Sequence, residues 1–251
     1  MRPAPAATID EVIKQLTDII DWAEKNGHRL GYFPALYRKV TIQVKAGIAN
    51  GIFEDGPRME KLDIIFANRY LDAFFANQAS GNLTESWKYA FDTANRWRPI
   101  VLQHLLLGMN VHINLDLGIA AAQTVPPDKL DSLKLDFARI NKLLADLIND
   151  VQNELAEIWP LLKLIDVLAG RFDEFLAKFG IELTRDRAWK VAETISKTPP
   201  DQLAEQIAEL DQEVMKISRI IASPGRFFSF LLFLIRILER PSVSKNIQIL
   251  S

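Results

Sequence analysis

Residues 99–127 decide the fold, and they read PIVLQHLLLGMNVHINLDLGIAAAQTVPP from Pro99 to Pro127. This stretch contains no Lys, Arg or Glu, and Asp116 is its only formal charge. A helix that is apolar on every side belongs in a protein interior. The sequence therefore predicts a buried central helix, from about residue 99 to about residue 122, around which the rest of the chain folds.

The predicted central helix also carries polar side chains that need hydrogen-bond partners in the protein interior, because a buried donor or acceptor left unpaired costs about 1–3 kcal/mol. Residues four apart lie nearly above one another on an α-helix, so His104, Gly108, His112 and Asp116 form one stripe. Glycine costs about 1 kcal/mol relative to alanine inside a helix. Gly108 therefore predicts the close approach of another backbone or of a ligand.

Capping patterns divide the flanking sequence into further helices. The sequence contains no sustained alternation of apolar and polar residues, which is the pattern that would predict a strand. We expect an all-α, single-domain bundle of about ten helices over residues 8–240, with a flexible lead at 1–7 and a tail at 241–251. The predicted starts and ends are Thr8 to Gly27, Gly31 to Gly51, Pro57 to Gln78, Asn82 to Trp97 and Asp128 to Trp159, with later starts at Thr184, Thr198 and Ser223.

Composition excludes several function classes. The 251 residues are 49% apolar and 25% charged with a net charge of -2, so no global positive field favours nucleic acid. The absence of cysteine excludes disulfides and thiolate metal sites and agrees with a cytoplasmic protein. The most apolar run, Phe227 to Leu238, is shorter than the roughly 20 residues of a membrane-spanning helix, so we expect no transmembrane span.

Three interpretations of the polar stripe stay open. His112 and Asp116 are spaced to hold one divalent metal, such as zinc, iron or manganese, with His104 or a carboxylate from another helix as a third ligand. Without a metal, Asp116 would orient His112 as a general base, and His104 would complete the polar core of the site. In the third interpretation these residues are a structural hydrogen-bond network that specifies packing.

Other polar residues are candidates for contacting a substrate. Asn110 and Asn114 lie on the face of the central helix beside the stripe. On the third predicted helix, Asn68, Arg69 and Asp72 share a region that could complete the site, although Arg69 and Asp72 also fit an ordinary surface pair. Tyr37 and Arg38 on the second helix are further candidates, with a buried tyrosine and a solvated cation as the alternative.

The run from Phe227 to Leu238 is apolar and aromatic on every face. It fits the closure of a lipid-like binding cavity, peripheral contact with a membrane, or a homodimer interface. A final core helix is the simpler alternative.

Three segments resemble a bacterial family catalogued only as a domain of unknown function. They are GYFPALYRKVT at 31–41, RMEKLDIIFANRYLD at 58–72 and QHLLLGMNVHINLDLG at 103–118. The resemblance covers roughly residues 8 to 220 and implies a shared organisation without an established activity. Our leading hypothesis is an enzyme, metal-dependent in one version, that acts on an apolar or lipid-like small molecule; the alternative is a non-catalytic protein that binds a lipid, an isoprenoid or a partner protein.

Overall fold

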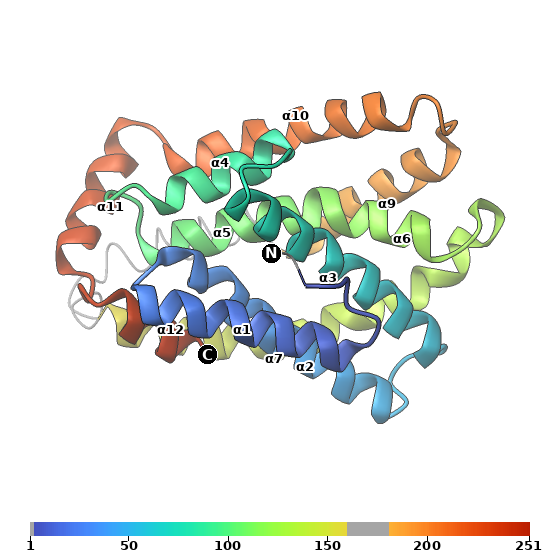
Figure 1. Cartoon of the computed structure of the whole chain (residues 1–251), viewed down its shortest axis with the longest axis horizontal. Helices are drawn as coiled ribbons and strands as arrows, with labels where there is room; N and C mark the ends of the chain where they lie inside the picture. The colour runs from blue at the N-terminus through green and yellow to red at the C-terminus, as the bar shows by residue number, and fades with distance from the viewer. Residues whose placement is uncertain (1–2, 160–180) are drawn as a thin grey trace.

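The computed structural model describes residues 3–159 and 181–251, which form eleven α-helices and no strand (Figure 1). The predicted all-α class is therefore confirmed. The helices are α1 (Ile9–Asn26), α2 (Tyr32–Ala49), α3 (Gly56–Gln78), α4 (Glu85–Ala94), α5 (Val101–Val111), α6 (Gly118–Thr124), α7 (Lys134–Ile158), α9 (Ile181–Lys197), α10 (Leu203–Ala222), α11 (Arg226–Leu238) and α12 (Val243–Leu250).

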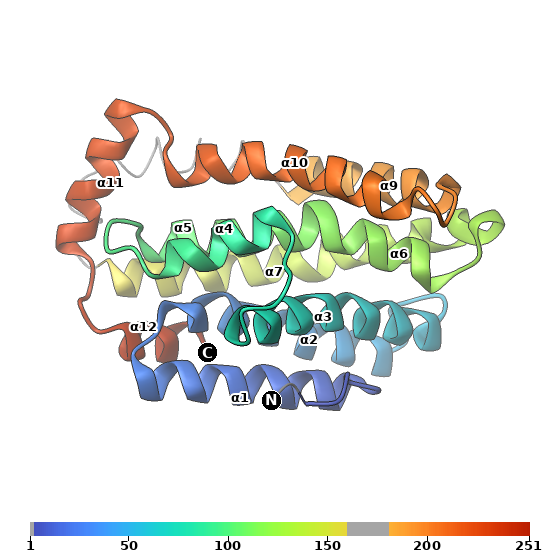
Figure 2. The same cartoon turned by 45° about the horizontal axis from the view of Figure 1, so that its top comes forward.

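The central helix lies between two outer layers (Figure 2). Helices α1, α2, α3 and α12 cover one side of it, and α9 and α10 cover the other, while α4, α5, α6 and α7 lie between them. Residues 101–124 run as one continuous element, α5, the π-helical turn η2 (His112–Leu117) and α6. The predicted central helix is therefore present, but its middle is a π-helix, in which each backbone bond spans five residues.

Almost every side chain of the central element is buried, as its composition predicts. By length and composition alone, residues 101–124 could also cross a membrane, but 83% of their apolar window is buried inside the protein. The same test admits α10 and α11 as a pair bent by 62°. Burial on all sides identifies residues 101–124 as the core helix of this bundle.

The predicted helix starts are correct where a capping side chain hydrogen-bonds to a backbone amide of the first turn. Thr8 caps α1 by accepting from the Glu11 amide at 3.2 Å, and Gly27 ends α1 with a positive φ of 58°. The start predicted at Asn82 is wrong, because the hydroxyl of Thr84 caps α4 instead. Helix α4 also ends at Ala94, short of Trp97.

Later boundaries also differ from the sequence prediction, and the starts expected at Thr198 and Ser223 precede the first residues of α10 and α11 by five and three residues. The helix expected from Asp128 begins only at Lys134, after the 3-10 turn η3 (Pro127–Leu133). Thr184 lies inside α9 and does not begin it. Apolar spacing therefore located these helices, and local turn geometry set their ends.

Ala6 and α12 (Val243–Leu250) are held on the bundle, although the sequence prediction placed them in a flexible lead and a tail. The amide of Asn68 accepts from the Ala6 backbone N–H at 2.9 Å and donates to the Ala6 carbonyl at 2.8 Å, so the lead is held at this residue. The tail contains α12, which buries Ile247 and Leu250 against α1, α2 and α7. Helix α12 therefore completes the core beyond residue 240.

Candidate functional site

The π-helical turn places His112 and Asp116 beside each other in the centre of the molecule. Nδ1 of His112 lies 3.3 Å from Oδ2 of Asp116, and both side chains are almost fully buried. Turns of π-helix occur frequently at functional sites. The predicted pairing of these two residues is therefore present in the structure.

Asp116 is the hub of the polar contacts. Its Oδ1 accepts from Nε of Arg69 on α3 at 2.8 Å, and its Oδ2 accepts from Nε1 of Trp87 on α4 at 2.9 Å. Burial acts to raise the pKa of Asp116, but the Arg69 cation and the donors from His112 and Trp87 hold that pKa below its ordinary value. Asp116 is therefore ionised and balanced by Arg69.

An ionised Asp116 fixes the state of His112. Burial lowers the pKa of His112, although Asp116 opposes this effect, so the imidazole is neutral at pH 7. Because the ionised carboxylate of Asp116 can only accept, the single proton of the neutral His112 ring lies on Nδ1, which faces it. Nε2 therefore carries a free lone pair. This is the arrangement in which a carboxylate orients a histidine base.

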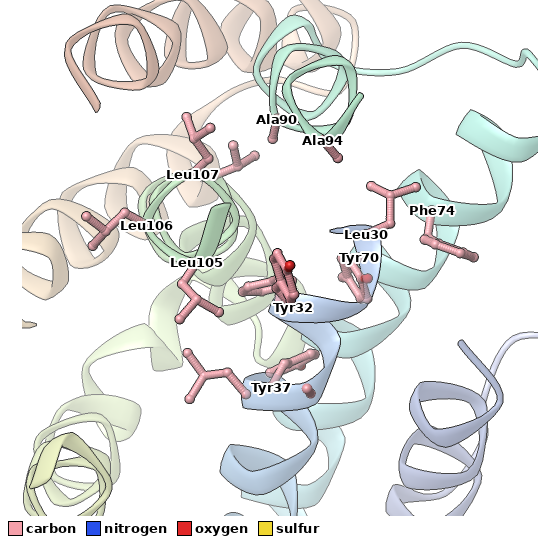
Figure 3. Packing of buried hydrophobic residues seen from close by; sticks show 14 of the residues in the cluster. Leu30, Tyr32, Tyr37, Tyr70, Phe74, Ala90, Ala94, Leu105, Leu106 and Leu107 are labelled. Atoms are coloured by element: carbon pink, nitrogen blue, oxygen red, sulfur yellow. The ribbon is translucent and has the colours of Figure 1, made fainter. Parts of the chain in front are cut away.

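Aromatic side chains surround the His112 ring. Phe66 stacks on it with ring centroids 3.6 Å apart and planes 9° apart, and Tyr37 meets it edge-on at 4.5 Å. The full set of rings, which we call the aromatic cluster, is Phe33, Tyr37, Phe66, Tyr70 and Trp87. Figure 3 shows Tyr37 of α2 and Tyr70 of α3 in the packed core with Leu105 of α5.

Three buried polar atoms in this region have no well-aligned hydrogen-bond partner: Nε2 of His112, Oδ2 of Asp63 and the hydroxyl of Tyr37, whose nearest candidate partner is the Thr41 side chain. They come from three elements, η2, α2 and α3. Asp63 lies close enough to Tyr37 for its charge to raise the pKa of that hydroxyl, in addition to the larger effect of burial. Burial also raises the pKa of Asp63 itself to about 7.

Unpartnered polar groups are uncommon in protein interiors and need an explanation. Here they comprise an acceptor, a hydroxyl and a carboxyl group that titrates near neutral pH. Environments that push the pKa values of neighbouring groups apart are typical of acid–base sites. This region can therefore accept a proton at His112 and offer a hydrogen bond from Tyr37 or from protonated Asp63.

The structure does not bring His104 to this site. Eight residues separate it from His112, a rise of about 12 Å along an α-helix. Between them, Gly108 is covered by the Phe33 ring, since a Cβ at Gly108 would lie 2.5 Å from Cγ of Phe33. The predicted close approach at Gly108 is therefore that of a side chain.

His104 belongs to a different cluster at the start of the central helix. Its ring lies 5.7 Å from the ring of Tyr32. Burial, with smaller contributions from Arg29 and Arg236, lowers the pKa of His104 to about 3. His104 is therefore neutral throughout the working range of most proteins.

The residues do not fit the metal site that the sequence suggested. Among the residues that the structure describes, no group of three or more His, Asp or Glu side chains could hold a metal ion. Both oxygens of Asp116 already accept hydrogen bonds, one of them from the Arg69 cation. A divalent ion would have to displace these donors and share the carboxylate with a positive charge.

The other predicted substrate contacts lie elsewhere in the fold. Asn110 donates to the Val214 carbonyl at 3.1 Å and to the Ser218 hydroxyl at 2.9 Å, and it accepts from Asn114 at 2.8 Å. These bonds tie the central helix to α10, and they leave Oδ1 of Asn114 buried without a partner.

Three further candidates are held at the periphery. The side-chain amide of Asn68 is bonded to the backbone of Ala6. Asp72 is exposed on α3. Arg38 donates to the Thr17 hydroxyl at 3.3 Å and to the Ser251 carbonyl at 3.2 Å, which joins α2 to α1 and the C-terminal residue. Of the predicted contacts, only Arg69 and Tyr37 lie at the His112 site.

Sequence reasoning missed Asp63, Phe66 and Trp87. Asp63 and Phe66 lie three residues apart, with Tyr70 one turn further along the same face of α3, so an acid among core positions was a readable signal. Trp87 is seen only in the fold, because it reaches Asp116 from another helix.

Comparison with known proteins places the chain in a family. Searches of curated proteins and of solved structures found no match. Residues 9–224 match the model of a family of unknown function, DUF5995, a range that holds every residue of the His112 site. This match confirms the resemblance that the three sequence segments indicated. Because it covers most of the sequence, the chain belongs to the family of unknown function DUF5995.

Proposed function

We propose that this protein is an acid–base enzyme that acts on a small, largely apolar substrate, with His112 as the general base and Asp116 as the residue that positions it. The observation that carries the proposal is the unpartnered Nε2 of His112, whose opposite ring nitrogen faces Asp116. No metal takes part in the proposed step.

In this proposal Nε2 of His112 takes a proton from an acidic O–H or C–H of the substrate, and the electron pair of that bond stays on the substrate. Asp116 stabilises the imidazolium that forms. Arg69 and Asp116 already balance each other, so transfer creates a second balanced pair of charges, the imidazolium and the substrate anion. Tyr37 and protonated Asp63 are placed to donate hydrogen bonds to the polar head of the substrate.

The aromatic cluster supports the choice of an apolar and planar substrate. Aromatic rings pack against one another in stacked or edge-on geometries with centroids about 4.5–7 Å apart. The Tyr37 ring and the Phe66 ring approach His112 from two directions, so a substrate must meet aromatic faces. Because His112 is only 2% exposed, the substrate reaches Nε2 only after side chains of this cluster part.

The test uses p-nitrophenol, a planar phenol whose ionised form absorbs visible light, and histidine nitrogen NMR of the same samples. We expect binding to shift the Nε2 resonance of His112 and to raise the ionised fraction of the phenol. His112→Gln should abolish both effects. The matched control is His104→Gln, which alters a second buried histidine of the same central element and should leave both effects intact. An equal response in His112→Gln and the unaltered protein would reject the proposal.

A second candidate function is a non-catalytic bundle in which these residues are a structural network. The observation that favours it is that Asp116 joins the central helix to α3 and α4 through Arg69 and Trp87. In that case His112→Gln would lower stability, and the phenol would neither bind nor ionise in any variant.

A further inference from the structure

Helix α11 (Arg226–Leu238) differs in position from the other helices. Whereas most helices run along the long axis of the bundle, α11 crosses one end of it and links the layer of α10 to the layer of α12 (Figure 2). In α11 only Ile235 and Arg236 are buried, so α11 is not the core helix that was the simpler alternative. Among the residues that the structure describes, the outer side of α11 forms an end surface of the bundle (Figure 2).

The outer side of α11 carries a continuous apolar stripe. Phe230, Leu234 and Ile237, spaced four and three residues apart, are 58%, 39% and 56% exposed. Trp97, from the loop before α5, is also exposed, and its ring lies 6.2 Å from that of Phe233. We call these five residues the α11 face. Contiguous exposed apolar surface of this kind marks a contact site.

Among the residues that the structure describes, exposed basic side chains lie in α11 and in the segments beside it along the chain. In residues 214–240 the basic side chains Arg219, Arg226 and Arg240 are exposed, whereas Lys216 is paired with Glu213, which lies just before this range. The only acid in this range, Glu239, is buried and paired with Arg236. Arg96 and Arg98 flank Trp97 and are exposed. A cationic rim therefore borders an aromatic and aliphatic surface.

A recess adjoins this surface. A cavity of about 370 Å³ lies between the start of α5, the end of α10 and α11, and its lining includes Phe230 and Phe233 of the α11 face. Arg98 and the hydroxyl-bearing residues Ser223 and Ser229 also line it. A cation with two hydroxyls is a suitable environment for a phosphate-bearing head group.

We propose that the α11 face docks onto a membrane surface that contains anionic lipids, with the apolar stripe inserted at the headgroup boundary and the arginines on lipid phosphates. Helices that lie in the interface bury their apolar side by about 5–10 Å and gain from attraction to anionic lipid. Each basic residue near such a surface adds about 1 kcal/mol, or roughly fivefold in affinity. This proposal is independent of the chemistry proposed for His112.

The same charges argue against a second copy of the chain as the occupant. A two-fold interface brings the same surface patch of both copies together. The exposed arginines of one copy, Arg98 and Arg226, would then lie in the same interface as those of the other copy, without an exposed acid from residues 214–240 to balance them. An anionic lipid surface complements this rim.

The test measures co-sedimentation of the full chain with vesicles of phosphatidylcholine alone and with vesicles that also contain phosphatidylglycerol. We expect binding to the anionic vesicles that weakens as salt increases. The triple variant Phe230→Ser, Leu234→Ser, Ile237→Ser should bind on the order of 100-fold more weakly, since each exposed apolar side chain that leaves water contributes roughly fivefold. The variant Arg98→Gln should lose about fivefold on anionic vesicles.

The matched control is Leu135→Ser with Ile42→Ser, because both residues are exposed apolar side chains on other helices. This control and His112→Gln should bind vesicles like the unaltered protein, and circular dichroism should show that all variants fold. Equal binding by the triple variant would overturn the proposal, as would no binding to anionic vesicles. A dimer that the triple variant dissociates, without vesicle binding, would assign the α11 face to a second copy.

Discussion

Replacing Asp116 by Asn tests the centre of the site by stability alone. The Asp116 carboxylate is 1% exposed and accepts from Arg69, Trp87 and the His112 ring. An amide would present an N–H group to one of these donors. The charge-assisted bond to Arg69 contributes about 1.5–3 kcal/mol, and a buried donor left unpaired costs about 1–3 kcal/mol.

These two contributions sum to about 4 kcal/mol. Because the Arg69 side chain is 23% exposed, water can hydrate its guanidinium in the variant and offset part of this destabilisation. We expect Asp116→Asn to lower the free energy of unfolding by about 3 kcal/mol. Urea denaturation at pH 7 measures this value. The matched control is Asp18→Asn, which breaks the exposed pair with Lys14 and should cost less than about 1 kcal/mol. A loss at Asp116 no larger than that at Asp18 would refute the assignment of Asp116 as an ionised hub.

Three further predictions follow from contacts and charges elsewhere. Gly118→Ala should destabilise the fold by about 1–3 kcal/mol in denaturation experiments, because its Cβ would lie 2.5 Å from Cβ of Val191; no destabilisation would show that α9 moves freely away from α6. The pKa of Asp63 is raised from 3.8 to about 7, so the stability that its protonated form contributes is full below pH 3.8 and is lost as pH rises through 7. Asp63→Asn should therefore flatten the stability curve over this window, and an unchanged curve would contradict the raised pKa. Metal analysis of protein purified without a nickel column should find no stoichiometric ion, and one equivalent of metal lost in His112→Ala would contradict that expectation.

The burial of the central helix could be predicted because it depends on local sequence. Residues 99–127 carry a single charge, and such a segment has nowhere stable to lie except in the core. The caps at Thr8 and Gly27 were predictable for the same reason, since each acts on the first or last turn of its own helix. The spacing of four also correctly paired His112 with Asp116.

The predictions that were wrong concern contacts between helices, which the spacing of residues within one helix does not reveal. A stripe drawn on one helix joins His104 to His112, but Phe33 arrives from α2 and covers Gly108 between them. The partner of Asp116 on α4, Trp87, cannot be read from spacing within the central helix. The sequence prediction placed residues 241–251 in a tail, yet α12 buries the apolar side chains Ile247 and Leu250 against three other helices.

The unpartnered atoms and the well-paired hub argue for different roles within one site. A buried polar atom requires a partner, because each unpaired one costs about 1–3 kcal/mol, and Nε2 of His104 and Oδ1 of Asn114 also lack a partner outside this site. Asp116 meets that requirement through three partners, whereas Nε2 of His112, the Tyr37 hydroxyl and Oδ2 of Asp63 do not. Asp116, which positions the His112 ring, is fully hydrogen-bonded, whereas the groups that would face a substrate are not. In the acid–base function proposed above, Asp116 and Arg69 would hold the structure of the site and His112 would perform the chemistry.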